Sequence, residues 1–187
     1  MKQIIKSVFA LSLLSMVSAC RVAPKPAMPV SHDLGSIIPL KNSMAVTLTA
    51  PVWLWNEKIR YRLLYKDATA VAYYNLDRWA APLPALLKHR LMVTANTTAQ
   101  ELHIHLTQFE QQFSAINNAH VLMTFTVSAF AGDSKLLLAK RSFTLSYKTT
   151  TADAEGAIAG FVVLTEQANK VISVWLESLL DTRNSGN

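Results

Sequence analysis

The cysteine at position 20 is the residue whose surroundings point most directly to a defined chemistry. It is the only cysteine among the 187 residues, and it follows the run Val17-Ser18-Ala19. Small residues before a single cysteine resemble a bacterial lipobox, in which the thiol receives a diacylglycerol and a peptidase cuts just before the cysteine. We therefore predict lipidation of Cys20. Ordinary cleavage after Ala19, which would leave a free thiol, is the alternative.

The residues before this cysteine, 1–19, have the pattern of a lipoprotein signal peptide. Lys2 and Lys6 form a positive start, and residues 8–17 are mostly apolar. That run is shorter than the ~20 residues a membrane-spanning helix needs. Arg21 stands where lipoproteins retained in the inner membrane usually carry aspartate. We expect a protein anchored by lipid in the outer membrane, with its domain facing the periplasm.

The remaining chain divides into a linker, one domain and a tail. Several prolines within residues 20–30 predict a stiff, extended linker behind the lipidated cysteine. Residues 31–181 carry the periodic patterns of a single folded domain, and residues 182–187 form a polar, flexible tail. Hydrophobic residues make up 51% of the chain, enough for a real core, and the formal net charge is +6. Because a secreted protein is separated from nucleic acid, we predict no nucleic-acid partner.

A segment near position 55 combines aromatic and basic side chains that suit contact with lipid or with a partner protein. Trp53 and Trp55 are two residues apart and would share one face of an extended chain. Lys58, Arg60 and Arg62 alternate in the same way on a predicted strand. We name these five residues as candidate contacts, because cations near a membrane attract anionic headgroups. Core packing of the tryptophans, a solvated strand face, and a structural ion pair for Arg62 are the alternatives.

The histidines offer a further, weaker hypothesis. His103 and His105 share a strand face, and His120 could approach them from the next strand. Such a group could hold a metal, although hydrogen-bonded histidines are the commoner outcome. We predict no metal and no cofactor. The sequence also contains no nucleophile elbow, metalloprotease helix motif or phosphate loop, so we predict no catalytic residues and no enzyme.

The elements that position these residues follow from hydrophobic periodicity. Alternating patterns predict strands over residues 44–49, 58–65, 71–74, 101–109, 119–130 and 136–147. Helical spacing predicts a helix over residues 79–91 and a long C-terminal helix that begins at Asp153 or Glu155. Trp79 should pack its helix onto the sheet. The expected fold is α/β, a mixed β-sheet with a three-strand antiparallel meander and helices packed on it.

Laid end to end, several segments resemble one family, the ABC-type transport auxiliary lipoproteins. This family includes the outer-membrane lipoprotein component of paraquat-inducible-type systems. The resemblance covers nearly the whole chain after the lipobox, and the order of the segments is its most specific feature. A second tryptophan, Trp55, departs from the family pattern. The segments are His32-Asp33-Leu34-Gly35, Ala50-Pro51-Val52-Trp53-Leu54, Ile59-Arg60-Tyr61-Arg62, Asn75-Leu76-Asp77-Arg78-Trp79-Ala80-Ala81-Pro82-Leu83 and the leucine-rich residues 86–91.

The resemblance implies a role in lipid transport between the two membranes. Members of the family work with an inner-membrane ABC permease and an MCE-domain protein, form or dock the outer-membrane end of the system and are not catalysts. The family fold is an α/β sandwich with a mixed sheet, and a homo-oligomer is plausible. A structural or assembly lipoprotein that binds an outer-membrane protein is the second hypothesis. A periplasmic hydrolase is the third.

Overall fold

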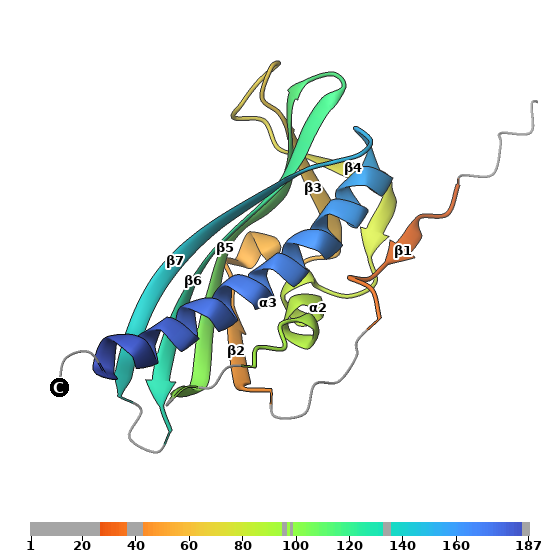
Figure 1. The fold of residues 1–187 in the computed structure, drawn as a ribbon. Coiled ribbons are helices and arrows are strands. Elements are labelled where there is room, and N and C mark those ends of the chain that lie inside the picture. The colour runs from red at the N-terminus through yellow and green to blue at the C-terminus, as the bar shows by residue number, and fades with distance from the viewer. Residues whose placement is uncertain (1–26, 37–42, 95–96, 98, 133–135, 185–187) are drawn as a thin grey trace, which may run out of the picture.

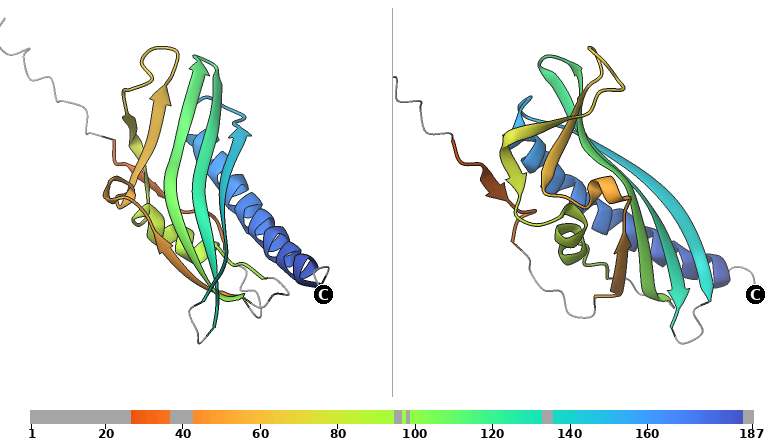
Figure 2. Two further views of the ribbon diagram at one scale, coloured as in Figure 1. Left: turned by 90° about the vertical axis from the view of Figure 1, so that its left-hand side faces the viewer. Right: turned by 180° about the vertical axis from the view of Figure 1, so that it is seen from behind.

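Among the described residues the fold is an open mixed β-sheet with two α-helices on one face (Figures 1 and 2). The computed structural model describes residues 27–36, 43–94, 97, 99–132 and 136–184. The predicted signal peptide, Cys20 and most of the predicted linker lie outside the described residues. Within the described ranges, no helix combines the length and apolar character needed to cross a membrane.

The predicted strands and helices occur in the predicted order, and β1 and η2 are additional elements. The strands are β1 (Val30–His32), β2 (Ala45–Thr49), β3 (Lys58–Leu63), β4 (Ala72–Trp79), β5 (Ala99–Ala115), β6 (Asn118–Ala131) and β7 (Leu137–Lys148), and the helices are η2 (Val52–Leu54), α2 (Leu83–Arg90) and α3 (Ala154–Asn184). The sheet order is β1-β4-β3-β5-β6-β7, with β2 pairing with β5 outside this path. Parallel pairs join β1 to β4 and both β2 and β3 to β5, and the other neighbours are antiparallel. The predicted mixed sheet and the antiparallel meander β5-β6-β7 are confirmed.

Strands β2 and β3 lie end to end along one edge of β5, whose other edge is covered by β6. The pairing of β2 ends with Thr49 opposite His105, and β3 first pairs with β5 at Gln111. Residues 106–110 of β5 therefore have no strand partner on this side. Pro51, which cannot donate a ladder hydrogen bond, follows β2 and starts the segment containing η2 that bridges the break. The candidate site lies at this break.

Trp79 is buried where β4, β5 and α3 meet. Its ring makes edge-on contacts with Phe109 of β5 and Phe161 of α3, at centroid distances of 6.2 and 5.8 Å. Trp79 thus packs a helix onto the sheet, but its predicted place at the start of a helix is wrong. Pro82 delays the start of α2 to Leu83, because the residue before a proline avoids the helical region, and Pro84 lies in the first turn, where the missing N–H is tolerated. The strand predicted over 71–74 instead continues to Trp79.

Helix α3 is fixed by a cap at its start and by a close approach to the sheet. The carboxylate of Asp153 accepts a hydrogen bond from the N–H of Gly156 at 2.8 Å, which satisfies a donor of the first turn. At Gly160 an added Cβ would lie 2.7 Å from Cγ2 of Val121 on β6. Glycine therefore lets the helix lie close against the meander. The helix begins where predicted and continues to Asn184, past the expected end of the domain.

Candidate functional site

The two exposed tryptophans lie on the segment that bridges β2 and β3. The chain forms the short helix η2 here and is not extended, so Trp53 and Trp55 do not share a face. Leu54 takes the buried position between them, and the exposed fractions of Trp53 and Trp55 are 55% and 49%. The core-packing interpretation is therefore wrong for both. Each tryptophan lines a different cavity.

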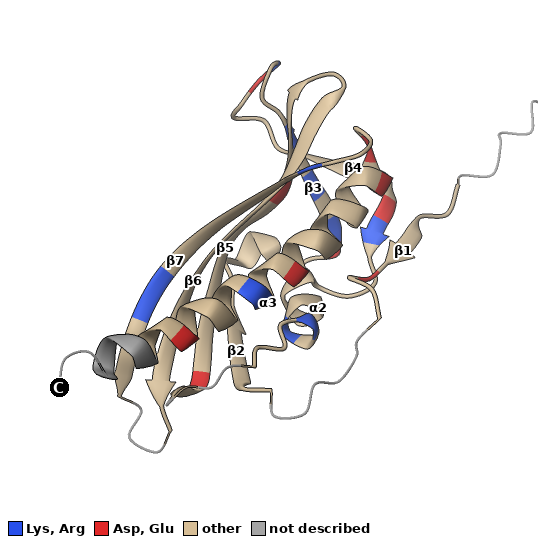
Figure 3. Cartoon of the chain, in the orientation of Figure 1, with Lys and Arg blue, Asp and Glu red and all other residues tan. Residues whose placement is uncertain are grey.

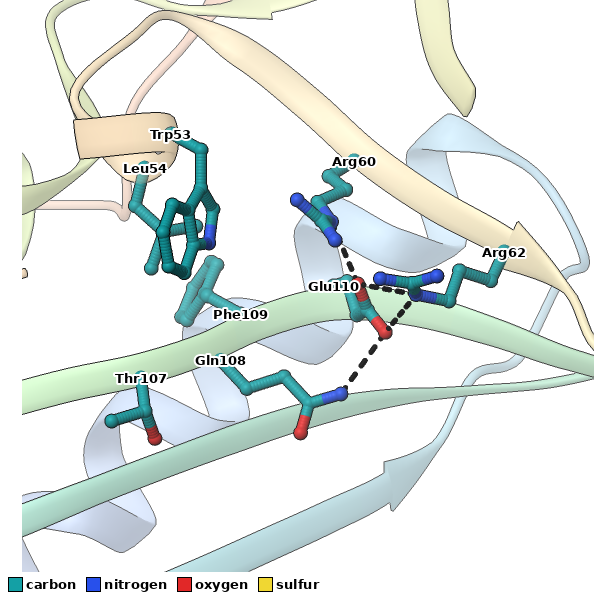
Figure 4. Close-up of a pocket in the computed structure, with 8 residues that line it drawn as sticks. All are labelled: Trp53, Leu54, Arg60, Arg62, Thr107, Gln108, Phe109 and Glu110. Carbon is teal, nitrogen blue, oxygen red and sulfur yellow. Dashed lines mark hydrogen bonds and ion pairs between the residues drawn. The ribbon is translucent and has the colours of Figure 1, made fainter. Parts of the chain in front are cut away.

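The first cavity, called here the Arg60–Arg62 cavity, opens at the break in the sheet (Figure 4). Its volume is about 370 Å³. Residues from η2 form one wall, β3 supplies two arginines, and the unpaired stretch of β5 forms the floor. The lining residues are Trp53, Leu54, Arg60, Arg62, Thr107, Gln108, Phe109 and Glu110.

Glu110 is the central charge of this cavity, and only 1% of its side chain is exposed. Its carboxylate accepts hydrogen bonds from Nε of Arg60 at 2.7 Å and Nε of Arg62 at 2.8 Å. The amides of Gln108 and Gln112 donate to it at 3.0 and 2.8 Å. Burial by itself raises the pKa of Glu110, but these four neighbours together hold that pKa below its ordinary value. The group is therefore a buried, fully partnered carboxylate.

The three basic residues predicted to form one stripe on β3 do not share one environment, because only Arg60 and Arg62 pair with Glu110. Arg60 and Arg62 have exposed fractions of only 15% and 21%, so they do not form a solvated face. Both make the kind of structural ion pair that was the alternative for Arg62. Lys58 is exposed, and its ammonium group lies 5.0 Å from the ring centre of Tyr73. A shift of register between Lys58 and Arg60 separates the lysine from the arginines.

Glu110 is the functional candidate that sequence reasoning missed. The strand predicted over 101–109 stops one residue before Glu110 and six residues before the end of β5, because alternation of apolar residues fades at Phe109. In the structure β5 continues through the polar run Gln108-Phe109-Glu110-Gln111-Gln112. A single acidic residue inside this polar run, with two arginines on another predicted strand, is the signal in the sequence. A buried carboxylate needs cationic partners, so the three residues could have been linked.

The second cavity, called here the Trp55 cavity, lies beside β1 and β4. Its volume is about 750 Å³, and it contains aromatic, basic and acidic side chains. Lys58 and Arg78 are opposite each other in the β3–β4 pairing, and Asp77 binds His32 of β1 at 2.8 Å. The lining residues are Pro29, Trp55, Asn56, Glu57, Lys58, Tyr73, Tyr74, Asn75, Asp77, Arg78 and Pro82.

The three histidines are not brought together. His105 lies opposite Thr126 of β6, which is six residues from His120, or about 20 Å along the strand. His103 binds the carboxylate of Glu101 at 2.8 Å, and His105 binds the hydroxyl of Thr49 at 2.9 Å. Within the described ranges, no group of three or more histidine, cysteine or acidic side chains is arranged to hold a metal.

Comparison with known proteins shows a shared fold. No family model matches the chain, and no curated protein matches it. Protein XCC0632 from Xanthomonas campestris, described under the family model DUF330, is similar with a TM-score of 0.61 at 18% identity, covering 89% of this chain and 96% of that one. The crystal structure of an uncharacterised protein is similar with a TM-score of 0.56 at 16% identity, covering 78% and 99%. At these identities the similarity establishes the fold alone.

Proposed function

We propose that this chain is a non-enzymatic outer-membrane lipoprotein, an auxiliary component of an ABC/MCE-type intermembrane lipid transport system. The main observation in support is the position of the predicted anchor relative to the exposed aromatic and basic surface. Eight residues lie between Cys20 and Pro29, and the nine Cα-to-Cα steps of an extended chain from one to the other span at most ~32 Å. Pro29 lines the Trp55 cavity. Lipidation of Cys20 would thus keep this cavity close to a bilayer.

The surface around this cavity has a composition suited to a membrane or to a partner beside one. Half-exposed tryptophan is common at membrane–water boundaries, where its ring is apolar and its N–H is polar. Lys58 and Arg78 add cations at the same place, beside the carboxylates of Glu57 and Asp77, and basic segments lie on β3 and at the end of β4 beside β1 (Figure 3). Each such cation near an anionic surface contributes about 1 kcal/mol of attraction. These features support a docking role beside the outer membrane.

The test is cross-linking in living cells followed by mass spectrometry. The proposal expects the acylated chain to be recovered with an MCE-domain protein or a permease subunit, and expects deletion of the protein to sensitise the outer membrane. Cys20→Ala is the matched control, because it removes the anchor and leaves every described residue unchanged. It should lose both the acyl mass and the partner. Recovery of the intact chain without any such partner would contradict the proposal.

The second hypothesis, an assembly lipoprotein that binds an outer-membrane protein, has one observation in its favour. Strand β7 is at the end of the sheet order and has no neighbour on its outer side among the described residues. A free strand edge can pair with an extended segment of another chain. Cross-links that lead only to an outer-membrane protein, through residues of β7, would favour this second function over transport.

A further inference from the structure

The Arg60–Arg62 cavity contains more positive charge than its own carboxylate neutralises. Two guanidinium groups share the single carboxylate of Glu110, which leaves one net positive charge at the cluster. Glu110 accepts hydrogen bonds from the Nε nitrogen of each arginine and from none of their outer nitrogens. Arg62 uses one of these, Nη1, to donate to the carbonyl oxygens of Ala68 and Thr69, both at 3.2 Å.

The other outer nitrogens remain available to a ligand. Nη1 and Nη2 of Arg60, Nη2 of Arg62 and the indole Nε1 of Trp53 have no hydrogen-bond partner among the described residues. The outer nitrogens of the partly buried Arg60 and Arg62 are not among the fully enclosed unpaired atoms of the described residues, so they remain accessible, and Trp53 is itself 55% exposed. Figure 4 shows the guanidinium group of Arg60 facing the ring of Trp53, with Glu110 behind it. Donors from two elements therefore converge on one space.

Glu110 cannot compete for these donors. Two arginines and two glutamine amides already occupy its oxygens, so it positions the guanidinium groups and adds no free acceptor. A guanidinium group fixed by Nε presents its two outer N–H bonds as a planar fork, the geometry that matches a phosphate or carboxylate. The cavity is thus complementary to an oxyanion.

The volume of the cavity and the residues at its rim restrict the class of ligand that it can bind. A volume of about 370 Å³ is near the lower limit for small-molecule sites, so it fits a headgroup and excludes long acyl chains. Trp53 and Leu54 provide an apolar wall beside the arginines. A ligand with an anionic head and an adjoining apolar part would use both surfaces.

We infer that the Arg60–Arg62 cavity binds a phosphate-class oxyanion through the two outer nitrogens of Arg60 and Nη2 of Arg62, with Trp53 packed against the adjoining part of the ligand. The same chemistry is presented by a phospholipid headgroup and by free phosphate. The proposal of an oxyanion site is based on the geometry of the cavity alone. The proposal that the phosphate belongs to a lipid rests on the proposed transport function.

The experiment uses the full acylated chain in non-ionic detergent micelles. Calorimetric titration with sn-glycerol 3-phosphate and inorganic phosphate should show binding, and glycerol should show none. Arg60→Gln should weaken binding at least about tenfold, the size expected for one charge-assisted bidentate contact. Arg60→Lys, which keeps the charge that Glu110 needs and loses the fork, should weaken it less while preserving the fold.

Lys58→Gln is the matched control variant. It removes the same charge from the same strand, but Lys58 lies against Tyr73 in the other cavity. We expect less than about a twofold change in affinity, as for a distant surface charge that salt screens. Equal weakening by Lys58→Gln and Arg60→Gln would show a diffuse charge effect and overturn the site. If neither phosphate compound binds to the wild-type chain, the proposed site is overturned as well.

A second experiment tests whether the phosphate group belongs to a lipid or to a soluble compound. Native mass spectrometry of the same protein compares phosphatidylglycerol with diacylglycerol of the same acyl chains, which lacks the phosphate. Retention of phosphatidylglycerol alone, and its loss in Arg60→Gln, supports a lipid headgroup. If both soluble phosphate compounds bind but the two lipids are retained equally, the lipid source is overturned and the oxyanion site stands. The calorimetric and mass-spectrometric results do not depend on which partner is cross-linked in cells. The transport proposal is therefore tested independently of the oxyanion site.

Discussion

Glu110 shows how a single buried charge can organise a site, because the removal of its carboxylate leaves two cations without a counter-charge. Arg60 and Arg62 are mostly enclosed, so neither can recover its full hydration. We expect Glu110→Gln to lower the free energy of unfolding by about 3 kcal/mol, near the lower end for breaking a buried ion pair. Arg60→Gln should lower the free energy of unfolding by about 1 to 2 kcal/mol, because Glu110 still has Arg62 and two glutamine amides as hydrogen-bond partners. Urea denaturation followed by circular dichroism measures both.

The pH dependence of stability tests the same carboxylate. Its pKa is lowered on folding, so the unfolded chain takes up the proton first as the pH falls below the ordinary value of 4.5. The stability contributed by ionised Glu110 is therefore present above that pH and is lost on acidification. Wild-type protein should lose more unfolding free energy than Glu110→Gln between about pH 6 and pH 3. Parallel pH profiles for the two proteins would show that Glu110 is not held ionised by its neighbours.

Two tryptophans provide a paired test of burial. Trp79 contacts Phe109 and Phe161 inside the core, whereas Trp53 lies at the rim of a cavity. Trp79→Ala should lower the free energy of unfolding by about 3 to 5 kcal/mol through lost packing and a cavity. Trp53→Ala should change it by less than about 0.5 kcal/mol, as for other exposed positions. Equal effects of the two substitutions in chemical denaturation would contradict this difference in burial.

At the scale of elements, the packing of α3 against β6 depends on a missing side chain. A methyl group at Gly160 would meet Cγ2 of Val121, whose branched side chain is stiff and fully buried. Gly160→Ala should therefore destabilise the protein by about 1 to 3 kcal/mol, although alanine favours a helix. Val121→Ala creates room at the same point. The double variant should be less destabilised than the sum of the single variants, and strict additivity in denaturation measurements would argue against this contact.

The sequence predicted the elements better than the site, for reasons visible in particular residues. Long alternating runs identified β5, β6 and β7 because one face of each packs on the core, and helical spacing identified α3 in the same way. The break between β2 and β3 depends on pairings with β5 that are distant in sequence, and no local pattern reports them. Trp53 and Trp55 were therefore assigned to one face, although the turn at η2 separates them. Glu110 was missed because its partners come from another strand.

At the scale of the whole molecule, the two ends of the described chain lie far apart. Strand β1 is at one side of the domain and the C-terminal end of α3 is at the opposite side, in all three views (Figures 1 and 2). The Trp55 cavity lies beside β1, because Pro29 is among its lining residues. An anchor at Cys20 would consequently place the two sides of the domain at different distances from the membrane.

This asymmetry predicts the orientation of the anchored protein. A fluorophore attached at Asn75→Cys, in the Trp55 cavity, should be quenched more strongly by nitroxide lipids in vesicles than one at Glu177→Cys on the far part of α3. Each introduced thiol can be labelled selectively, because the acylated sulfur of Cys20 no longer reacts. A salt titration should weaken the difference, since Lys58 and Arg78 contribute attraction that ions screen. Equal quenching at both positions would mean that the linker lets the domain turn freely, and stronger quenching at 177 would place the opposite side against the bilayer.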